Sequence, residues 1–147
     1  MVYKKEQGLS MLEIMIALAI IAVMGVLVGP SLMKFLGQGR ETATKTRLAG
    51  LKQAVTDYIR DIGHPPNRKE GGLEALIESP KGSKIEKKWD GPYLEGVDEL
   101  PEDAWGNEFT YQTGKEIMHK KKYRYYEIIS PGENGDIEDG KIFHTGA

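Results

Sequence analysis

Residues 8–29 read GLSMLEIMIALAIIAVMGVLVG, and this stretch decides the fold. Every residue from Ile14 to Gly29 is apolar or glycine, and Glu13 is the only charged residue between Leu9 and Met33. Because a helix rises about 1.5 Å per residue, about 20 such residues cross a hydrocarbon core of about 30 Å. Residues 9–33 are therefore predicted to form a membrane-spanning helix.

The residues before this helix, 1–8, read MVYKKEQG and carry Lys4 and Lys5. Positive charge before an apolar span favours a short cytoplasmic leader, since basic flanks stay inside. An ordinary secretory signal peptide has a similar start. However, the apolar run here is long, has no small-residue cleavage pattern and continues into an amphipathic segment. A leader over 1–8 followed by a retained anchor is the better interpretation.

Glu13 stands at the head of the predicted membrane helix. An ionised side chain in a membrane helix costs about 2.5–3.5 kcal/mol at the helix centre, so such residues usually serve a function. A carboxylate near a helix N-terminus is also favoured by the helix dipole. The residue type alone leaves both interpretations open.

Gly25, Gly29 and Pro30 fall late in the apolar run. Glycine weakens a helix, and proline removes a backbone donor and clashes with the preceding turn. We expect a kink or local melting there, although membrane helices also tolerate both residue types without either.

Residues 34–62 are predicted to continue the helix as an amphipathic segment, which Gly63, Pro65 and Pro66 end. Steps of three and four place the apolar residues on one face, which we expect to pack against the C-terminal domain. They are Leu48, Leu51, Val55, Tyr58, Ile59 and Ile62. The opposite face carries charges, Arg47 among them, that are exposed in a monomer and available for pairing between subunits.

Residues 63–147 are predicted to form a small globular α+β domain. Gly72–Glu78 is expected to be a short helix, and the aromatic and β-branched content of Glu108–Gln112 and Tyr123–Ile129 predicts two strands. The fold class is therefore α+β, with a long N-terminal membrane-spanning helix packed on a small antiparallel sheet. Trp105-Gly106-Asn107 is expected to be a tight turn with a structural aromatic plug.

Composition narrows the functional classes. The chain has 147 residues, which is enough for one core and an anchor. It has no cysteine, and its net charge of -2 gives no general reason to bind nucleic acid. The basic aromatic stretch 115–125 is interpreted as a solvated hairpin. The three histidines, His64, His119 and His144, are scattered in sequence without an HExxH motif or nucleophile elbow, so an enzyme is not expected.

The segment from Gly8 to Glu13 resembles the processing site of the type IV pilin-like superfamily. The resemblance implies that a prepilin peptidase cuts between Gly8 and Leu9 and methylates the new N-terminus at Leu9. It also implies that Glu13 neutralises the N-terminal amine of a neighbouring subunit during assembly. Leu9 departs from the phenylalanine that the family usually has at the first mature position.

Three further segments narrow the resemblance to the major pseudopilins of type II secretion. They are His64-Pro65-Pro66 with Glu70–Leu76, Trp89–Leu94, and Leu100–Asn107. These are similar in order to the Tyr-Pro and Gly-Leu-x-Ala-Leu, Gly-Pro-Tyr and Asp-Pro-Trp-Gly-Asn elements of that branch, with Ala104 in place of the usual proline.

The loop SPGENGDIEDG, residues 130–140, gathers acidic residues among glycines. Oxygen ligands on a flexible loop suit calcium, although a solvated acidic turn has the same composition. The resemblance implies calcium in the corresponding loop. The candidate ligands are Ser130, Asn134, Asp136 and Asp139, with Asn134 where the family usually has aspartate.

The resemblance implies a structural subunit of a type II secretion pseudopilus, a filament that drives exoprotein export. A type IV pilin for adhesion, motility or DNA uptake is the alternative. The implied partners are further copies of the chain in a helical filament, minor pseudopilins, prepilin peptidase and an inner-membrane assembly platform. The implied location is the bacterial inner membrane, crossed once, with the C-terminal domain in the periplasm.

Overall fold

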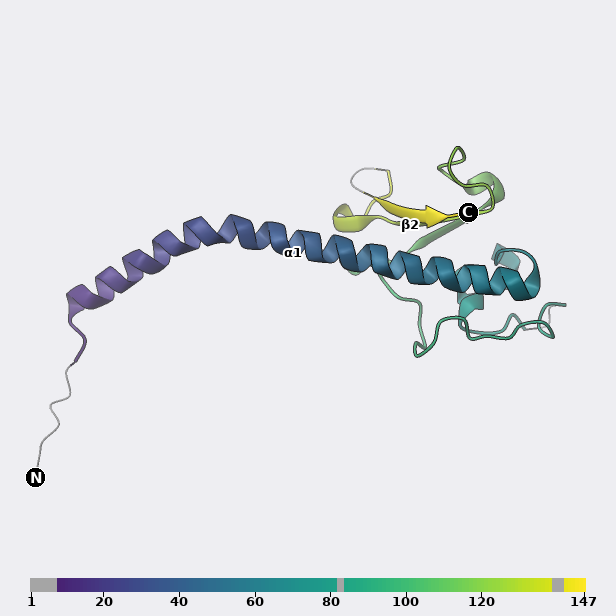
Figure 1. Cartoon of the computed structure of the whole chain (residues 1–147), viewed down its shortest axis with the longest axis horizontal. Helices are drawn as coiled ribbons and strands as arrows, with labels where there is room; N and C mark the ends of the chain where they lie inside the picture. Colours follow the sequence, from purple (N-terminus) through teal and green to yellow (C-terminus); the bar gives the residue numbers. More distant parts are fainter. Residues whose placement is uncertain (1–7, 82–83, 139–141) are drawn as a thin grey trace, which may run out of the picture. The chain divides into compact units, whose positions relative to one another are not determined.

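The structure is a computed structural model that describes residues 8–81, 84–138 and 142–147. Its longest element is α1, Met11–Ile62 (Figure 1). The chain divides into two compact units, Met1–Gly39 and Arg40–Ala147, and α1 contributes to both.

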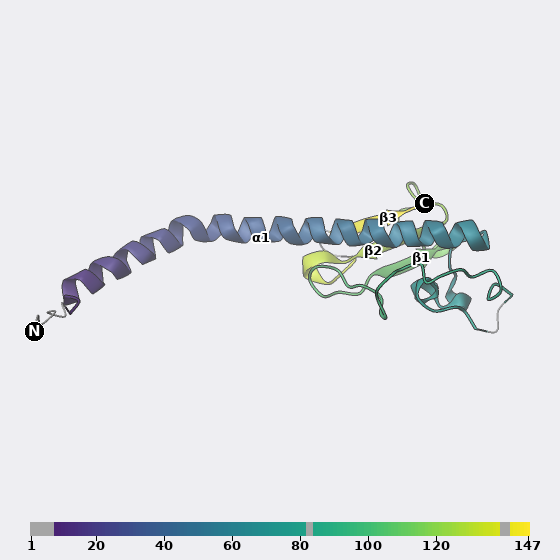
Figure 2. The same ribbon diagram turned by 60° about the horizontal axis from the view of Figure 1, so that its bottom comes forward.

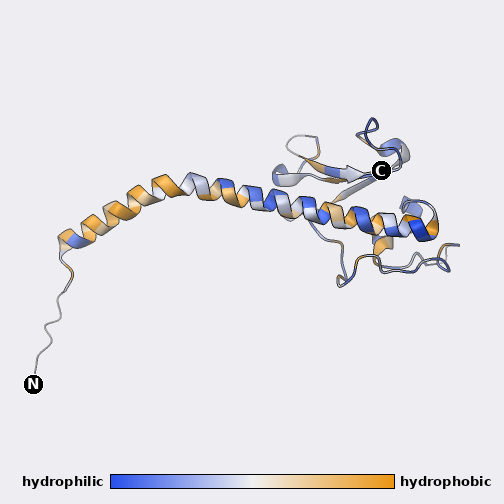
Figure 3. Ribbon diagram, viewed as in Figure 1, coloured by the Kyte–Doolittle hydropathy of each residue, from blue (hydrophilic) through white to orange (hydrophobic). Residues whose placement is uncertain are grey.

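The first unit is a helix without a core of its own. Among the described residues that precede Thr44, none is buried, and the large apolar side chains from Leu9 to Leu36 are exposed. Figure 3 shows this stretch as a nearly continuous apolar ribbon. One described helix, α1, is long and apolar enough to cross a membrane, and its most apolar window is wholly exposed. The backbone stays α-helical through Gly25, Gly29 and Pro30, so this segment shows no local melting in the single chain, and the kink stays a prediction.

The second unit is organised around the remainder of α1. The expected apolar stripe is confirmed: Leu48, Leu51, Val55, Tyr58 and Ile62 are buried and Ile59 is partly buried. The helix ends at Ile62, where Gly63 adopts φ 99° and its amide donates to the carbonyl of Ile59 at 2.7 Å. The predicted glycine cap is therefore present.

Three antiparallel strands pack beside this part of α1 (Figures 1 and 2). They are β1 Thr110–Thr113, β2 Tyr126–Ser130 and β3 Phe143–Gly146, in the order β1-β2-β3. The two expected strands exist, but each begins later in the chain than predicted. Glu108 forms only an isolated bridge with Glu102, and residues 123–125 are not part of a strand. Strand β3 was not predicted.

The expected short helix at Gly72–Glu78 is a 3₁₀-helix, η2, Gly72–Leu76. It follows η1, Arg68–Glu70, which Asn67 and Glu70 close with a capping box. The remaining short helices are η3, Gly114–Glu116, and η4, Gly132–Asn134. Leu73, Ala75 and Leu76 of η2 join the core against α1.

Both faces of the central strand are covered. Tyr126 and Ile128 of β2 belong to the core that includes α1, and the alternation of a strand turns Glu127 and Ile129 to the outer face. All residues of β2 are buried. The lysines of the expected solvated hairpin are exposed, as predicted, whereas Ile117 and Tyr123 of the same stretch are buried. We call the buried residues Ile117, Tyr123 and Ile129 the outer apolar layer.

Candidate functional site

Glu13 caps the helix that it begins. Because α1 begins at Met11, Ser10 occupies the N-cap position and Glu13 the third helical position. The Glu13 Oε2 accepts a hydrogen bond from the Ser10 amide at 2.8 Å, which is one half of a capping box. The carboxylate also lies where the helix dipole favours negative charge. The local interpretation of Glu13 is therefore realised within one chain, and its contact with a neighbouring subunit stays a prediction.

The predicted processing site lies directly before the helix. Gly8 and Leu9 are exposed and outside regular secondary structure, and the Leu9 residue is 77% exposed. Because both residues are exposed, the peptide bond between them is accessible to a peptidase. Of the predicted leader, residues 1–8, only Gly8 is among the described residues.

A buried carboxylate that sequence reasoning missed organises the C-terminal unit. Asp103 is 2% exposed. Its Oδ1 accepts from the amides of Trp105 and Asn107, both at 2.9 Å. Its Oδ2 accepts from the Ser130 hydroxyl at 2.7 Å and the Gly132 amide at 3.3 Å. Asp103 therefore joins the turn 103–107 to the loop that follows β2.

These hydrogen bonds set the charge state of Asp103. Burial raises the pKa of the carboxyl, but the hydrogen bonds donated by Ser130, Asn107 and Trp105 outweigh burial, so the pKa lies below its usual range. Asp103 and the amides of Trp105 and Asn107 form an Asx-type turn, which the sequence Asp-Ala-Trp-Gly-Asn alone does not distinguish from an exposed turn.

The same turn is attached to α1. Arg47 Nη1 donates to the carbonyls of Glu102 and Asp103 at 2.8 and 2.9 Å, and the Ala104 amide donates to the Thr44 hydroxyl at 3.1 Å. Arg47 lies on the charged face that we expect to be available for pairing between subunits, so one charge of that face has an internal contact as well. The predicted turn with an aromatic plug is confirmed, since Gly106 adopts φ 86° and Trp105 stacks on Phe143 at 5.7 Å between ring centroids.

The structure separates the candidate calcium ligands. Ser130 is buried with its hydroxyl directed to Asp103, whereas Asn134 and Asp136 are exposed. Asp136 Oδ1 accepts from the Glu138 amide at 2.8 Å. Asp139 lies outside the described residues. Asn134 and Asp136, in the described part of the loop, carry oxygen atoms of the kind that calcium prefers, and the Ser130 hydroxyl donates to Asp103.

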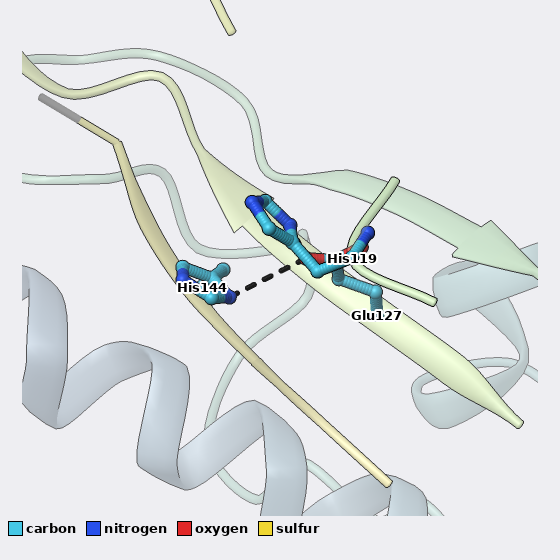
Figure 4. A group of neighbouring side chains, drawn as sticks. All are labelled: His119, Glu127 and His144. Carbon is cyan, nitrogen blue, oxygen red and sulfur yellow. Dashed lines mark hydrogen bonds and ion pairs between the residues drawn. The ribbon is translucent and has the colours of Figure 1, made fainter. Parts of the chain in front are cut away.

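Two histidines that are distant in sequence meet at a buried glutamate (Figure 4). Glu127 of β2 is 0% exposed, and His119 and His144 approach its carboxylate. One ligand atom from each of the three side chains lies within 4.8 Å of the others. His64 lies elsewhere, 3.8 Å from Glu70. Two of the three histidines are thus close in space, because the segment 114–125 returns to β2, where His119 contacts Glu127, and β3 pairs with β2.

Two family models match the chain. Residues 31–142 match the model described as type II secretion system (T2SS), protein G. Residues 3–29 match the prokaryotic N-terminal methylation motif, which includes Gly8, Leu9 and Glu13.

Similar proteins carry the same description. A type II secretion system core protein G of Pseudomonas aeruginosa is 33% identical over 138 residues, covering 92% of this chain and 92% of the relative. The corresponding protein of Escherichia coli (strain K12) is 28% identical over 134 residues, covering 90% of this chain and 86% of the relative. The crystal structure of the major pseudopilin from the type 2 secretion system of enterohaemorrhagic Escherichia coli matches with a TM-score of 0.55 at 24% identity. That match covers 78% of this chain and 93% of the crystallised chain, and it supports the fold.

Proposed function

Because the chain belongs to the type II secretion system protein G family, we propose that its copies assemble through residues 9–62 into a periplasmic filament that drives exoprotein export. Membership of this family favours the secretion filament over a type IV pilus. The family is a structural one, and its members assemble with other components of the secretion system. Minor pseudopilins, prepilin peptidase and the inner-membrane platform are the partners that we assign to this chain.

The observation that carries this proposal is the apolar helical unit without a core. From Leu9 to Leu36 the large apolar side chains are exposed along α1. Each such side chain gains about 1.5–3 kcal/mol when it leaves water, so a helix of this kind requires lipid or other helices. The same apolar surface of α1 can be covered in two ways. Lipid surrounds it while the subunit is stored in the inner membrane, and neighbouring subunits surround it in the filament.

Glu13 is the proposed assembly contact. After cleavage between Gly8 and Leu9, the new amine, methylated in the mature subunit, lies one residue before the helix cap. In an apolar filament core a carboxylate and an amine of different subunits stabilise each other where either alone is costly. The charge that is expensive in the membrane then favours addition of the next subunit.

Substitution of Glu13 separates helix capping from charge pairing. Glu13→Gln keeps an oxygen that can accept from the Ser10 amide but removes the charge, whereas Glu13→Ala removes both. We expect both variants to be cleaved and inserted, and neither to form filaments. Cleavage is measured by the mass of the chain, and assembly by the yield of sheared filaments.

Asp98→Asn is the matched control, since it removes one exposed negative charge from the C-terminal unit. It should assemble normally. Wild-type filament yield from Glu13→Gln would reduce Glu13 to a helix cap and would contradict the assembly role.

We also propose that loop 130–140 binds calcium, with Asp136 and Asn134 as ligands together with Asp139. Calcium takes 6–8 oxygen ligands, and the exposed carboxylate and amide of this loop are of the right chemistry. Because Ser130 fixes the loop to buried Asp103, calcium bound there would stabilise the C-terminal unit in a chain without disulfides. Thermal unfolding of the full chain should therefore shift to lower temperature with a chelator, and Asp136→Asn should abolish the shift. A midpoint of thermal unfolding that does not change on adding the chelator would contradict calcium binding.

A further inference from the structure

Glu127 is a charged group inside the outer apolar layer of the sheet. Its side chain is fully buried, on the same face of β2 as Ile129. Burial of a carboxylate is costly unless it is paired and hydrogen-bonded. The His119 amide donates to Glu127 Oε2 at 3.1 Å, and the His119 ring forms a short contact with Oε1 through Nδ1.

His144 reaches the same carboxylate from β3. The strands pair Ile129 with His144 and Glu127 with Gly146, so Glu127 and His144 are diagonal neighbours on one face. Gly146, directly opposite Glu127, lies against the Tyr123 ring and the Tyr126 carbonyl, where a Cβ would lie 3.0 and 2.3 Å from them. His144 Nδ1 lies 3.4 Å from Glu127 Oε1, yet this buried nitrogen makes no hydrogen bond. The His144 Nδ1 atom therefore lies close to the ligand atoms of His119 and Glu127 but makes no hydrogen bond.

We propose that His119, Glu127 and His144 bind one Zn²⁺ ion on the outer face of the sheet. Zinc takes imidazole nitrogen at about 2.0–2.1 Å and carboxylate oxygen at about 2.0–2.2 Å, commonly with three protein ligands and water. Ligand atoms of such a tetrahedral site lie about 3.4 Å apart, which is the separation of His144 Nδ1 and Glu127 Oε1. Calcium and magnesium prefer all-oxygen sites, so the two imidazoles select a transition metal.

Metal entry requires a small rearrangement of the rings. The two imidazoles stack at 4.2 Å between centroids and 15° between planes, and a shared metal must lie near both ring planes. Binding therefore tilts the rings apart and lengthens the short His119 contact with Glu127. The room for this motion is on the solvent side, where the side chains of His119 and His144 are 36% and 23% exposed.

The bound ion would tie three parts of the chain together. His119 belongs to the segment that covers the sheet, Glu127 to the central strand and His144 to the edge strand β3. The carboxylate supplies the negative charge that the cation requires. The exposed Lys122 acts on His144 electrostatically and opposes the cation, but water screens a charge at that position. This site is independent of the proposed calcium loop and of filament assembly.

Zinc titration of the full chain in detergent, after removal of bound metal, tests the proposal. Calorimetry should show one Zn²⁺ per chain, and the midpoint of thermal unfolding should rise with Zn²⁺. His119→Gln and His144→Gln should each weaken binding by at least about tenfold, since even residues outside the ligand shell are worth 10–100-fold. Co²⁺ should give the intense visible absorption of a four-coordinate site.

Two matched variants distinguish this site from other binding. His64→Gln removes the remaining histidine and should leave the Zn²⁺ affinity unchanged. Asp136→Asn removes a proposed calcium ligand and should also leave the Zn²⁺ affinity unchanged. Equal affinity in wild type and His144→Gln, or loss of binding in His64→Gln, would overturn the proposal. If a ligand variant fails to fold, the Co²⁺ spectrum of the wild-type chain decides: a spectrum of the free aqueous ion refutes the site.

Discussion

At the scale of single residues, Asp103 shows how one buried charge can organise two loops. Its two oxygens accept from the turn that contains it and from the start of the loop after β2. The Asn107 side chain adds a second link, since its Nδ2 donates to the Gly132 carbonyl at 2.7 Å. Because both oxygens of Asp103 accept hydrogen bonds, a neutral amide, which has only one oxygen, could not accept all of them.

We expect Asp103→Asn to destabilise the C-terminal unit by about 3 kcal/mol, because an amide group would face donors that it cannot accept from. The measurement is chemical unfolding of the full chain in detergent, followed by the near-ultraviolet signal of Trp105 and its neighbours. Asp98→Asn, at an exposed site, should change the unfolding free energy by less than about 0.5 kcal/mol. Equal stability of the two variants would contradict the role of Asp103.

The depressed pKa of Asp103 also gives a pH dependence. The unfolded chain takes up the proton first, near the ordinary aspartate pKa of about 3.9, and the folded chain only at lower pH. The stabilisation is therefore complete above that pH and is lost as the pH falls through the folded pKa. In Asp103→Asn the unfolding free energy should decline less steeply below pH 4 than in wild type. A decline of the same slope would show that other carboxyls cause it.

Sequence reasoning at this scale found the residues of local motifs and missed those that long-range contacts create. Glu13 was identified because its charge is anomalous in an apolar run. Asp103 was not, since an aspartate in a turn is ordinary until burial and Ser130 are known. His119 and His144 look isolated in the sequence because 24 residues of chain and a strand pairing separate them.

At the scale of elements, the aromatic group around η2 depends on a glycine. Trp89 Nε1 donates to the Ala75 carbonyl at 2.8 Å, and the Trp89 ring meets Tyr93 edge-on. A Cβ at Gly91 would lie 2.5 Å from the Trp89 ring. The ring is held by both contacts and has little freedom to withdraw.

Gly91→Ala should therefore destabilise the chain by about 1–3 kcal/mol through overpacking. Gly50→Ala is the opposed control. Gly50 is an exposed helical residue, and a methyl group added there would meet no atom within 4 Å, so alanine should stabilise α1 by up to about 1 kcal/mol. Thermal unfolding of both variants measures the two shifts, and a shift of the same sign for both would refute the steric argument.

The elements themselves were unequally predictable. The end of α1 at Ile62 followed from the glycine and prolines after it, because these act locally. The strands depended on pairing: β2 begins at Tyr126, where Thr113 becomes its partner, and β3 is a four-residue strand, FHTG, with little β pattern of its own. Such a strand exists because β2 offers it an edge.

At the scale of the whole molecule, the chain keeps its core and its apolar surface in different units. The described residues 8–43 include no buried residue, while the core cluster begins at Leu48 of α1 and continues to Phe143. A subunit built this way can exchange lipid for neighbouring helices around one unit without disturbing the packing of the other.

It follows that residues 40–147 should fold alone, because removing 1–39 removes none of the described core. We expect a monomer by sedimentation that unfolds in one transition, with a midpoint within a few degrees of the full chain in detergent. Residues 56–147 provide the control, since they lack Leu48, Leu51 and Val55, which are each worth about 1–5 kcal/mol in a core. That loss approaches the entire stability of a small domain, about 5–15 kcal/mol, so the shorter chain should not fold. Aggregation or unfolding of 40–147 would instead mean that the apolar unit contributes to the fold as well as to anchoring and assembly.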